Sequence, residues 1–357
     1  MHQLEIARHF ALGAAPVSFI PFGNGHINET YLVTCENGTQ YILQKLNQKV
    51  FTKPVQVMEN ILAVTEHIRR KNPDPRCTLR VTPALHGECY WIDGDGEFWR
   101  VYDYIPGSIC LDAAETLEDF YQSAVGFGSF QKMLSDFRAD TLCETIPDFH
   151  NTADRYRKFR DAVQKDAAGR ADSVREEIAF YLDREEDGCR LGALLDAGKL
   201  PLRVTHNDTK LNNVMLDAVT RKALCVIDLD TVMPGLSVND FGDSIRFGAS
   251  TAAEDEQDLD KVWMDLDLYR TYTEGFLSAC GDSLTDEELS CLALGAKTMT
   301  LECGMRFLTD YLDGDHYFRI HRPGQNLDRS RTHIKLVSDM ETKWDRMNEI
   351  PHEIAGR

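Results

Sequence analysis

Two short polar segments in the second half of the chain carry the residues best suited to chemistry. The segment 206–213 presents an acid, a cation and an amide at close spacing, and an acidic segment begins fifteen positions after its last residue. The residues concerned are His206, Asp208, Lys210, Asn213, Asp228 and Asp230. A carboxylate can accept a proton from a hydroxyl, and carboxylate and amide oxygens are ligands for a hard cation. The pattern therefore indicates metal-assisted transfer of a phosphoryl group to a hydroxyl.

Each side chain has a defined task in such a reaction. Asp208 can accept the proton of the attacking hydroxyl, and Lys210 can reach the phosphoryl group in transfer. Asn213 and Asp228 supply oxygen ligands for Mg²⁺, which would hold the phosphates of a nucleotide. Asp230 is either a second, weaker metal ligand or a contact for the acceptor.

His206 and Asp240 are expected to support the segment 206–213, here called the catalytic loop. We expect the imidazole of His206 to bind the loop backbone rather than act as a base. The letters Asp240-Phe241-Gly242 spell a metal-binding motif of protein kinases, but they follow Pro234-Gly235 and not an apolar strand. We therefore expect Asp240 to cap the next helix and bind the catalytic loop, and Asp228 to be the metal ligand.

Short apolar runs must position these loops. The runs 202–204, 214–216 and 224–227 read as strands that lead into or out of the polar segments. Side chains on loops that follow such strands are held by a rigid scaffold. We expect Asp208 to face an acceptor oxygen, and Asn213 and Asp228 to converge on a common divalent ion.

The first hundred residues favour strands. Residues 30–34 and 40–44 flank Asn37-Gly38, a strong hairpin signal because both residues tolerate positive φ. A second hairpin is predicted from 88–92 and 97–104, and a helix beginning at Pro54 is predicted to end near residue 70. These elements indicate a small lobe that is based on an antiparallel sheet.

Helical spacing dominates after a break at 105–107, which we interpret as a hinge. The predicted helices span 114–135, 151–187, 258–279, 285–313 and 328–348. The fold class is therefore α+β with two lobes: residues 1–104 bind the nucleotide, and residues 105–357 carry the catalytic loop and bind the acceptor. The acidic run 253–258 is expected to be a solvated helix start, with a lure for a cationic substrate as the alternative.

Composition limits the partners. The 357 residues include 58 acids against 39 Lys and Arg, for a formal charge of −19, so nucleic acid and anionic membranes are unlikely partners. No two of the ten cysteines lie closer than eleven positions, which is typical of buried thiols in a reducing compartment. We see no secretory signal and no apolar run long enough to span a membrane. We expect a cytoplasmic monomer that binds small molecules.

Two segments outside the catalytic loop extend the pattern to a resemblance. Residues 21–31 resemble the nucleotide loop, and residues 99–107 the interlobe linker, of the choline-kinase and aminoglycoside-phosphotransferase superfamily, which has a protein-kinase-like fold. The resemblance implies that Gly23 and Gly25 let backbone N–H groups approach phosphate. It also implies that the backbone of Asp103, Tyr104 and Ile105 binds adenine.

Four longer stretches narrow the resemblance. Residues 204–213, 227–235, 240–251 and 302–307 are similar to those of bacterial N-acetylhexosamine 1-kinases. This resemblance implies phosphorylation of the anomeric hydroxyl of N-acetylglucosamine and N-acetylgalactosamine, with ATP as co-substrate and Mg²⁺ as cofactor. An N-acetyl sugar needs hydrogen-bond donors and a flat apolar wall. Candidates of the right types are His26, Thr231, Arg246, Phe247, Arg306 and Tyr317.

Some of these positions have competing interpretations. Arg306 has Glu302 and Asp310 four positions away on either side, which also suits an ion pair within one helix. Gln44 stands where the superfamily usually has a cation that reaches the phosphates, and alternation points Lys45 to the opposite strand face. Glu59 suits either a lysine partner there or the surface.

Two other functions remain open. The same chemistry on an amine-bearing acceptor, such as choline or an aminoglycoside, fits the charge of −19, although Arg246 and Arg306 disfavour a cationic acceptor. A nucleotide-binding regulator without turnover would explain the missing cation at Gln44.

Overall fold

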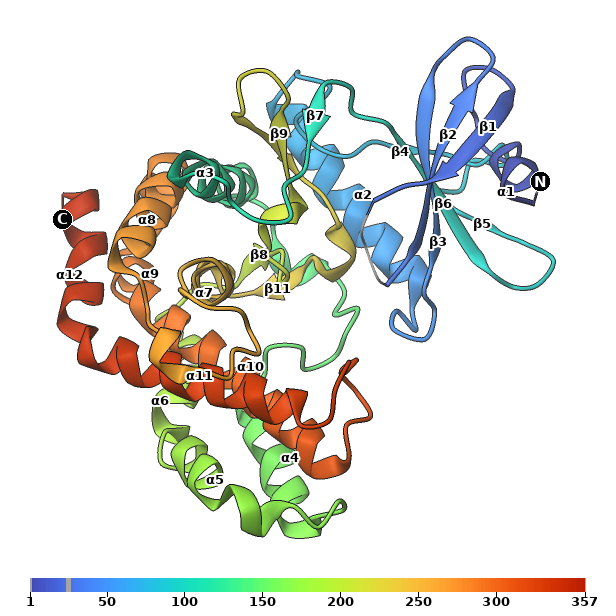
Figure 1. Ribbon diagram of the computed structural model, residues 1–357. Coiled ribbons are helices and arrows are strands. Elements are labelled where there is room, and N and C mark those ends of the chain that lie inside the picture. The colour runs from blue at the N-terminus through green and yellow to red at the C-terminus, as the bar shows by residue number, and fades with distance from the viewer. Residues whose placement is uncertain (1, 24–26, 357) are drawn as a thin grey trace.

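The computed structural model, which describes residues 2–23 and 27–356, has an antiparallel sheet in its N-terminal part and mostly helices in its C-terminal part (Figure 1). This arrangement confirms the predicted α+β class. The sheet has six strands in the order β1-β2-β3-β6-β4, with β5 also paired to β6. The strands are β1 (Pro16–Pro21), β2 (Glu29–Cys35), β3 (Gln40–Leu46), β4 (Val81–Thr82), β5 (Trp91–Ile92) and β6 (Phe98–Asp103).

Both predicted hairpins are present. Strands β2 and β3 are joined at Asn37-Gly38, where Gly38 has φ +81° and a side chain would be strained. Strands β5 and β6 are joined across residues 93–97. The prediction missed β1, which is an edge strand with proline at both ends; an edge position tolerates proline because not every N–H has to donate.

Helix α2 (Pro54–Lys71) joins the two parts. It begins with the predicted proline in its first turn. Its apolar side chains Val57, Met58 and Ile61 share one core with Phe127 and Val226 of the C-terminal part. The Asn60 amide also donates to the carbonyls of residues 143 and 232 at 2.8 and 2.9 Å. The helix therefore fixes the sheet to the segment that follows Asp230.

Two small sheets carry the polar segments of the C-terminal part. One sheet has the order β10-β9-β7 and the other pairs β11 with β8. Their strands are β7 (Ser108–Ile109), β8 (Arg203–Thr205), β9 (Val214–Asp217), β10 (Ala223–Val226) and β11 (Met233–Gly235). The catalytic loop runs from β8 to β9, and Asp228 and Asp230 lie between β10 and β11. The three predicted strands are confirmed, whereas β11 was not predicted.

Helices pack around these sheets and make up the rest of the C-terminal part (Figure 1). They are α3 (Leu117–Met133), α4 (Thr152–Lys165), α5 (Arg175–Leu182), α6 (Glu185–Asp196), α7 (Ser237–Gly248), α8 (Leu266–Cys280), α9 (Asp286–Ser290), α10 (Leu292–Asp313), α11 (Gln325–Thr342) and α12 (Trp344–Ala355). Short helix α1 (His2–Ala7) lies at the other end of the chain, against β1. No described helix is long and apolar enough to cross a membrane.

The predicted helices 151–187, 258–279, 285–313 and 328–348 all differ in extent from the observed ones, and two of these differences have a clear cause. The predicted helix 151–187 is three helices, because Asp166 and Gly169 adopt left-handed conformations that end α4. The acidic run 253–258 starts no α-helix: its last acid, Asp258, caps only the short 3-10 helix Leu259–Lys261, and α8 begins at Leu266, capped by the Asp265 side chain. Within that run Glu254 pairs with Arg246 instead of facing solvent alone.

Candidate active site where the sheet meets the C-terminal part

The catalytic loop is held from below by helix α7. The buried Asp240 carboxylate accepts hydrogen bonds from the backbone N–H groups of His206 and Asn207, both at 2.8 Å, and from the Gln131 amide at 2.7 Å. Asn207 has φ +65°, a left-handed conformation that these bonds stabilise. The predicted contact of Asp240 with the loop is therefore present. Its predicted capping role is not, because the N-cap of α7 is Leu236.

His206 binds backbone on both sides of its ring. Its Nε2 lies 2.8 Å from the Ile227 carbonyl oxygen, and its Nδ1 lies 3.3 Å from the backbone N of Asp208. Since a carbonyl can only accept and an amide N–H can only donate, Nε2 carries the proton and Nδ1 accepts. His206 is buried, and its ring connects the catalytic loop to the segment that leads to Asp228.

Asp208, Lys210 and Asn213 converge within the loop. The Lys210 ammonium lies 2.7 Å from Oδ1 of Asp208. The Asn213 amide nitrogen donates to the Asp208 carbonyl at 2.8 Å and lies 3.3 Å from its Oδ2. Burial disfavours the charge of Lys210, but the Asp208 carboxylate outweighs it and raises the pKa of the lysine. The Lys210 ammonium thus lies directly against the carboxylate that would accept the proton.

Asp228 lies next to this group because the backbone pairs there. The Ile227 N–H donates to the Asn213 carbonyl at 2.9 Å, beside the His206 bond to the Ile227 carbonyl. Asp228 itself is in the left-handed conformation, with φ 58° and ψ 55°. Its side chain is exposed to solvent, and no described residue donates to its carboxylate or forms an ion pair with it.

The surroundings of Asp228 disfavour the negative charge of its carboxylate. Protein atoms crowd around the carboxylate although solvent reaches it, and this desolvation, together with the negative charges of Asp230 and Asp208, raises its pKa to about 6. Asn213 uses its amide nitrogen on Asp208, which leaves its amide oxygen open among the described contacts. The residues that carry these two oxygen donors are thus brought close by the backbone pairing of Ile227 with Asn213, and their donor types fit the predicted metal.

Asp230, the other predicted metal ligand, is engaged by the N-terminal part instead. Its side chain is 2% exposed. Arg100 on β6 donates two hydrogen bonds to the Asp230 carboxylate, from Nη1 to Oδ1 at 2.5 Å and from Nη2 to Oδ2 at 2.9 Å. The Asn28 amide donates to Oδ2 at 2.7 Å. Both carboxylate oxygens are thus occupied.

No role was predicted for Arg100, although its position opposite Gln44 in the sheet points to one. Gln44 on β3 lies directly opposite Arg100, and its side-chain oxygen accepts from Nε and Nη2 of the arginine at 3.0 and 2.8 Å. Lys45 points to the other face, as alternation predicts, and pairs with Glu29 at 2.5 Å. The position that usually holds a cation is therefore an acceptor for a cation on the neighbouring strand.

The residues proposed to bind the nucleotide are described in part. Gly23 has φ +77°, with no atom near the position of a Cβ, whereas Gly25 and the sugar candidate His26 lie outside the described residues. The N–H groups of Asp103 and Tyr104 donate to the carbonyls of residues 80 and 40. Among the described contacts this leaves the N–H of Ile105 as the open backbone donor of the three. These roles stay predictions.

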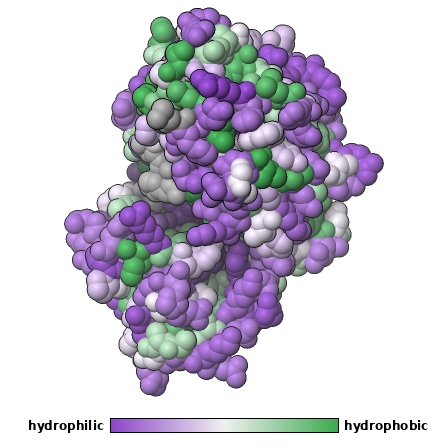
Figure 2. Space-filling view, turned by 90° about the vertical axis from the view of Figure 1, so that its right-hand side faces the viewer, coloured by the Kyte–Doolittle hydropathy of each residue, from purple (hydrophilic) through white to green (hydrophobic). Residues whose placement is uncertain are grey.

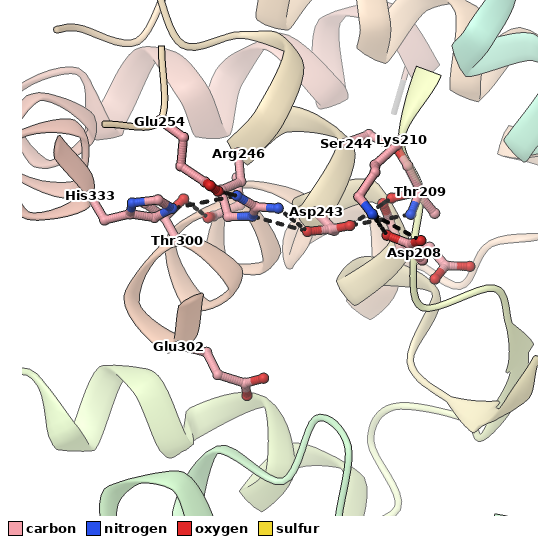
Figure 3. A network of polar contacts seen from close by, with 12 residues as sticks. Asp208, Thr209, Lys210, Asp243, Ser244, Arg246, Glu254, Thr300, Glu302 and His333 are labelled. Carbon is pink, nitrogen blue, oxygen red and sulfur yellow. Dashed lines mark hydrogen bonds and ion pairs between the residues drawn. The ribbon is translucent and has the colours of Figure 1, made fainter. Parts of the chain in front are cut away.

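The described sugar candidates other than Arg306 have different surroundings. Thr231 donates to the His206 carbonyl at 2.6 Å, and so lies at the catalytic loop. Arg246 is buried and bound by Asp243 and Glu254, in a chain of polar contacts that leads to Lys210 and Asp208 (Figure 3). Phe247 and Tyr317 are 46% and 73% exposed. Arg246 therefore has its charge neutralised within the protein.

Arg306 faces an open pocket and has no described carboxylate partner. The rings of Phe149, Tyr317 and Phe318 lie 6.0, 5.9 and 5.4 Å from its guanidinium carbon. The expected alternative, an ion pair within its helix, is not formed. Glu302 accepts from His150 and Thr152, and Asp310 accepts from the backbone N–H groups of residues 316–318.

One face of the molecule is hollowed. Figure 2 shows a hollow that separates an upper from a lower mass. The pocket of Arg306 is lined further by Arg155, Lys158 and Met305. Its lining also includes Asp310 and Asp313, so three cationic and two acidic side chains line the pocket. Burial and the positive charge of Arg306 lower the pKa of Arg155.

Comparison with known proteins gives a consistent result. The sequence model described as "Phosphotransferase enzyme family" matches residues 18–273. A microcompartment-associated aminopropanol kinase aligns with a TM-score of 0.66 at 18% identity over 97% of both chains. An aminoglycoside phosphotransferase from Alicyclobacillus acidocaldarius aligns with a TM-score of 0.61 at 14% identity, over 99% of this chain and 96% of the other. The amicoumacin kinase hAmiN, solved with AMP-PNP and Ca²⁺, gives 0.60 at 13% over 93% and 92%. At these identities the structures show a shared fold.

Proposed function

Because the chain belongs to the phosphotransferase enzyme family, we propose that it transfers the terminal phosphoryl group of ATP to a hydroxyl of a small molecule. The observation that carries this proposal is the cluster formed by Asp208, Lys210 and Asn213 beside the unpaired carboxylate of Asp228. It combines a proton acceptor, a cation and oxygen ligands within one hydrogen-bonded unit. Phosphoryl transfer needs these three elements.

The residues act together in the proposed reaction. The acceptor hydroxyl oxygen bonds to the γ-phosphorus as the bond from that phosphorus to the leaving oxygen of ADP breaks, and Asp208 takes the hydroxyl proton. Lys210 holds the Asp208 carboxylate in place and offers positive charge to the phosphoryl group. Asn213 and Asp228 would hold Mg²⁺, which neutralises the charge of the nucleotide phosphates when bound.

For the acceptor we propose the anomeric hydroxyl of N-acetylglucosamine or N-acetylgalactosamine. The resemblance of the catalytic stretches supports it, and so does the pocket in which Arg306 is flanked by three aromatic rings. Such a pocket offers hydrogen-bond donors and flat apolar walls to a neutral sugar. The aminopropanol kinase named above suggests an amino alcohol instead, but Arg306 and Arg155, which form no ion pair with any described residue, disfavour an ammonium group.

The decisive experiment compares matched acceptors with ATP and Mg²⁺. We expect the purified chain to phosphorylate N-acetylglucosamine and N-acetylgalactosamine, and the product to be a 1-phosphate by phosphorus NMR. Glucosamine, which exchanges the acetamide for an ammonium, should react poorly, and methyl N-acetylglucosaminide, which lacks a free anomeric hydroxyl, should not react. Preferred phosphorylation of aminopropanol or choline would replace the sugar by an amino alcohol, and no transfer to any acceptor would contradict the kinase proposal.

Arg306 allows the acceptor pocket to be tested on its own. We expect Arg306→Ala to raise the acceptor KM about tenfold or more, because one hydrogen bond from a charged group is worth about 1.5–3 kcal/mol. The KM for ATP should stay unchanged. Arg157→Ala is a matched control, since Arg157 on α4 is 62% exposed and pairs only with acids of its own helix. An unchanged acceptor KM in Arg306→Ala would remove the arginine from the acceptor site.

A further inference from the structure

We propose that Arg100 is a positioning residue that fastens the N-terminal sheet to the acidic segment and so fixes Asp228 for metal-nucleotide binding. The inference rests on the proposed function. Arg100 and Asp230 are each 2% exposed at their side chains, and they come from opposite sides of the junction between the sheet and the C-terminal part. The pair is therefore a buried bond across that junction.

The hydrogen bonds of Arg100 are saturated, which argues for a fixed role. Nε and Nη2 donate to Gln44, Nη1 and Nη2 donate to the two oxygens of Asp230, and Nη1 also lies 3.8 Å from the Met58 sulfur. A lysine has no planar fork, so it cannot make the two parallel bonds to one carboxylate and at the same time reach the Gln44 oxygen. The neutral acceptor at Gln44 suits an arginine opposite it, whereas a lysine at position 44 would place two cations together.

The consequence for Asp228 follows from the chain itself. Asp228 and Asp230 belong to one short turn, and Asp228 sits in the left-handed conformation, which is unfavourable for most non-glycine residues. The turn is held at one end by the Ile227 backbone bonds to the catalytic loop and at the other by Arg100 and Asn28. Without the contacts of Asp230 to Arg100 and Asn28, the Asp228 carboxylate can move away from the Asn213 amide.

This assignment gives Asp230 a different task from the one its sequence suggests. Its carboxylate is occupied by three donors, so the metal ligands are Asp228 and Asn213, and Asp230 acts through its bond to Arg100. Outer residues that orient metal ligands typically change metal affinity by about 10–100-fold when they are replaced. We therefore expect an effect on nucleotide binding that depends on Mg²⁺.

The test uses the double variant Arg100→Gln/Asp230→Asn. Removing both charges avoids leaving one buried ion unpaired, which would endanger folding. Binding of AMP-PNP is measured by calorimetry with Mg²⁺ and with EDTA, without any acceptor. We expect the Kd with Mg²⁺ to rise about tenfold, the Kd with EDTA to stay constant, and the acceptor KM to stay constant. Arg100→Lys, which keeps the charge but loses the fork, should show the same rise.

A second Arg–Asp pair supplies the control. Arg76 of the N-terminal part lies 2.9 Å from Asp217 on β9, so Arg76→Gln also removes a bond between the two parts but leaves the acidic segment untouched. It should bind Mg²⁺·AMP-PNP like the wild type. Wild-type affinity in the double variant, or an equal loss with EDTA, would overturn the role of Arg100. Failure of the unaltered chain to bind the nucleotide would instead overturn the proposed function.

Discussion

Replacing Asp208 by Asn is expected to lower turnover at least about 10²-fold, which is the lower end of the contribution of a general base. The carboxamide has nearly the same shape but cannot accept the hydroxyl proton. The fold should be preserved, because the backbone contacts of residue 208 remain and only its side-chain contacts with Lys210 and Asn213 change. Its N–H faces Nδ1 of His206, and its carbonyl accepts from Asn213. The acceptor KM should change far less than the turnover number.

The measurement is steady-state kinetics with ADP release coupled to a dehydrogenase, alongside thermal unfolding. Asp172→Asn is the control, since Asp172 is 90% exposed and pairs only with Arg175 on the surface. Wild-type turnover in Asp208→Asn would remove the carboxylate from the reaction. A matching loss in Asp172→Asn would show that the assay reports something other than the active site.

The catalytic loop could be predicted because its chemistry is local. Asp208, Lys210 and Asn213 lie within six residues, between strands that short apolar runs indicate, and the structure brings their side chains together. The structural role of His206 also followed from its place in the loop. The α+β class and both hairpins were accessible for the same reason, since Asn37-Gly38 and the alternating strands are signals of a few residues each.

Contacts between distant segments could not be predicted in this way. Arg100 and Asp230 lie 130 positions apart, and their bond depends on the strand register that sets Arg100 opposite Gln44. Sequence spacing alone made Asp230 resemble a metal ligand. Arg306 presents the same difficulty, because its neighbours four positions away are both bound by residues from elsewhere in the fold. Helical periodicity also ran across Asp166, whose left-handed conformation ends α4.

The second large effect is expected for Asp240→Asn, because the Asp240 carboxylate binds the backbone of the catalytic loop. The Asp240 carboxylate accepts three hydrogen bonds and is 1% exposed, so water cannot replace a donor that is lost. An amide can accept on one oxygen only, and its NH₂ group would face a backbone N–H at 2.8 Å in the other position. We expect the substitution to lower the free energy of unfolding by about 2–3 kcal/mol, the worth of a hydrogen bond to a charged group.

The variant should also lose activity under conditions in which it is folded. Asn207 holds its left-handed conformation, and Asp208 its direction, because the Asp240 carboxylate fixes the two preceding N–H groups. A displacement of about 1 Å in a reacting group can cost about 10²-fold in rate, so we expect a loss of that size in turnover at temperatures where the variant is folded. Asp267→Asn removes an exposed acid from the first turn of α8, and serves as the control for the helix-dipole contribution of Asp240. Because this prediction places Asp240 beneath the loop rather than on the metal, Mg²⁺ at saturating concentration should not restore the turnover of Asp240→Asn. Full recovery by excess Mg²⁺ would instead make Asp240 a metal ligand.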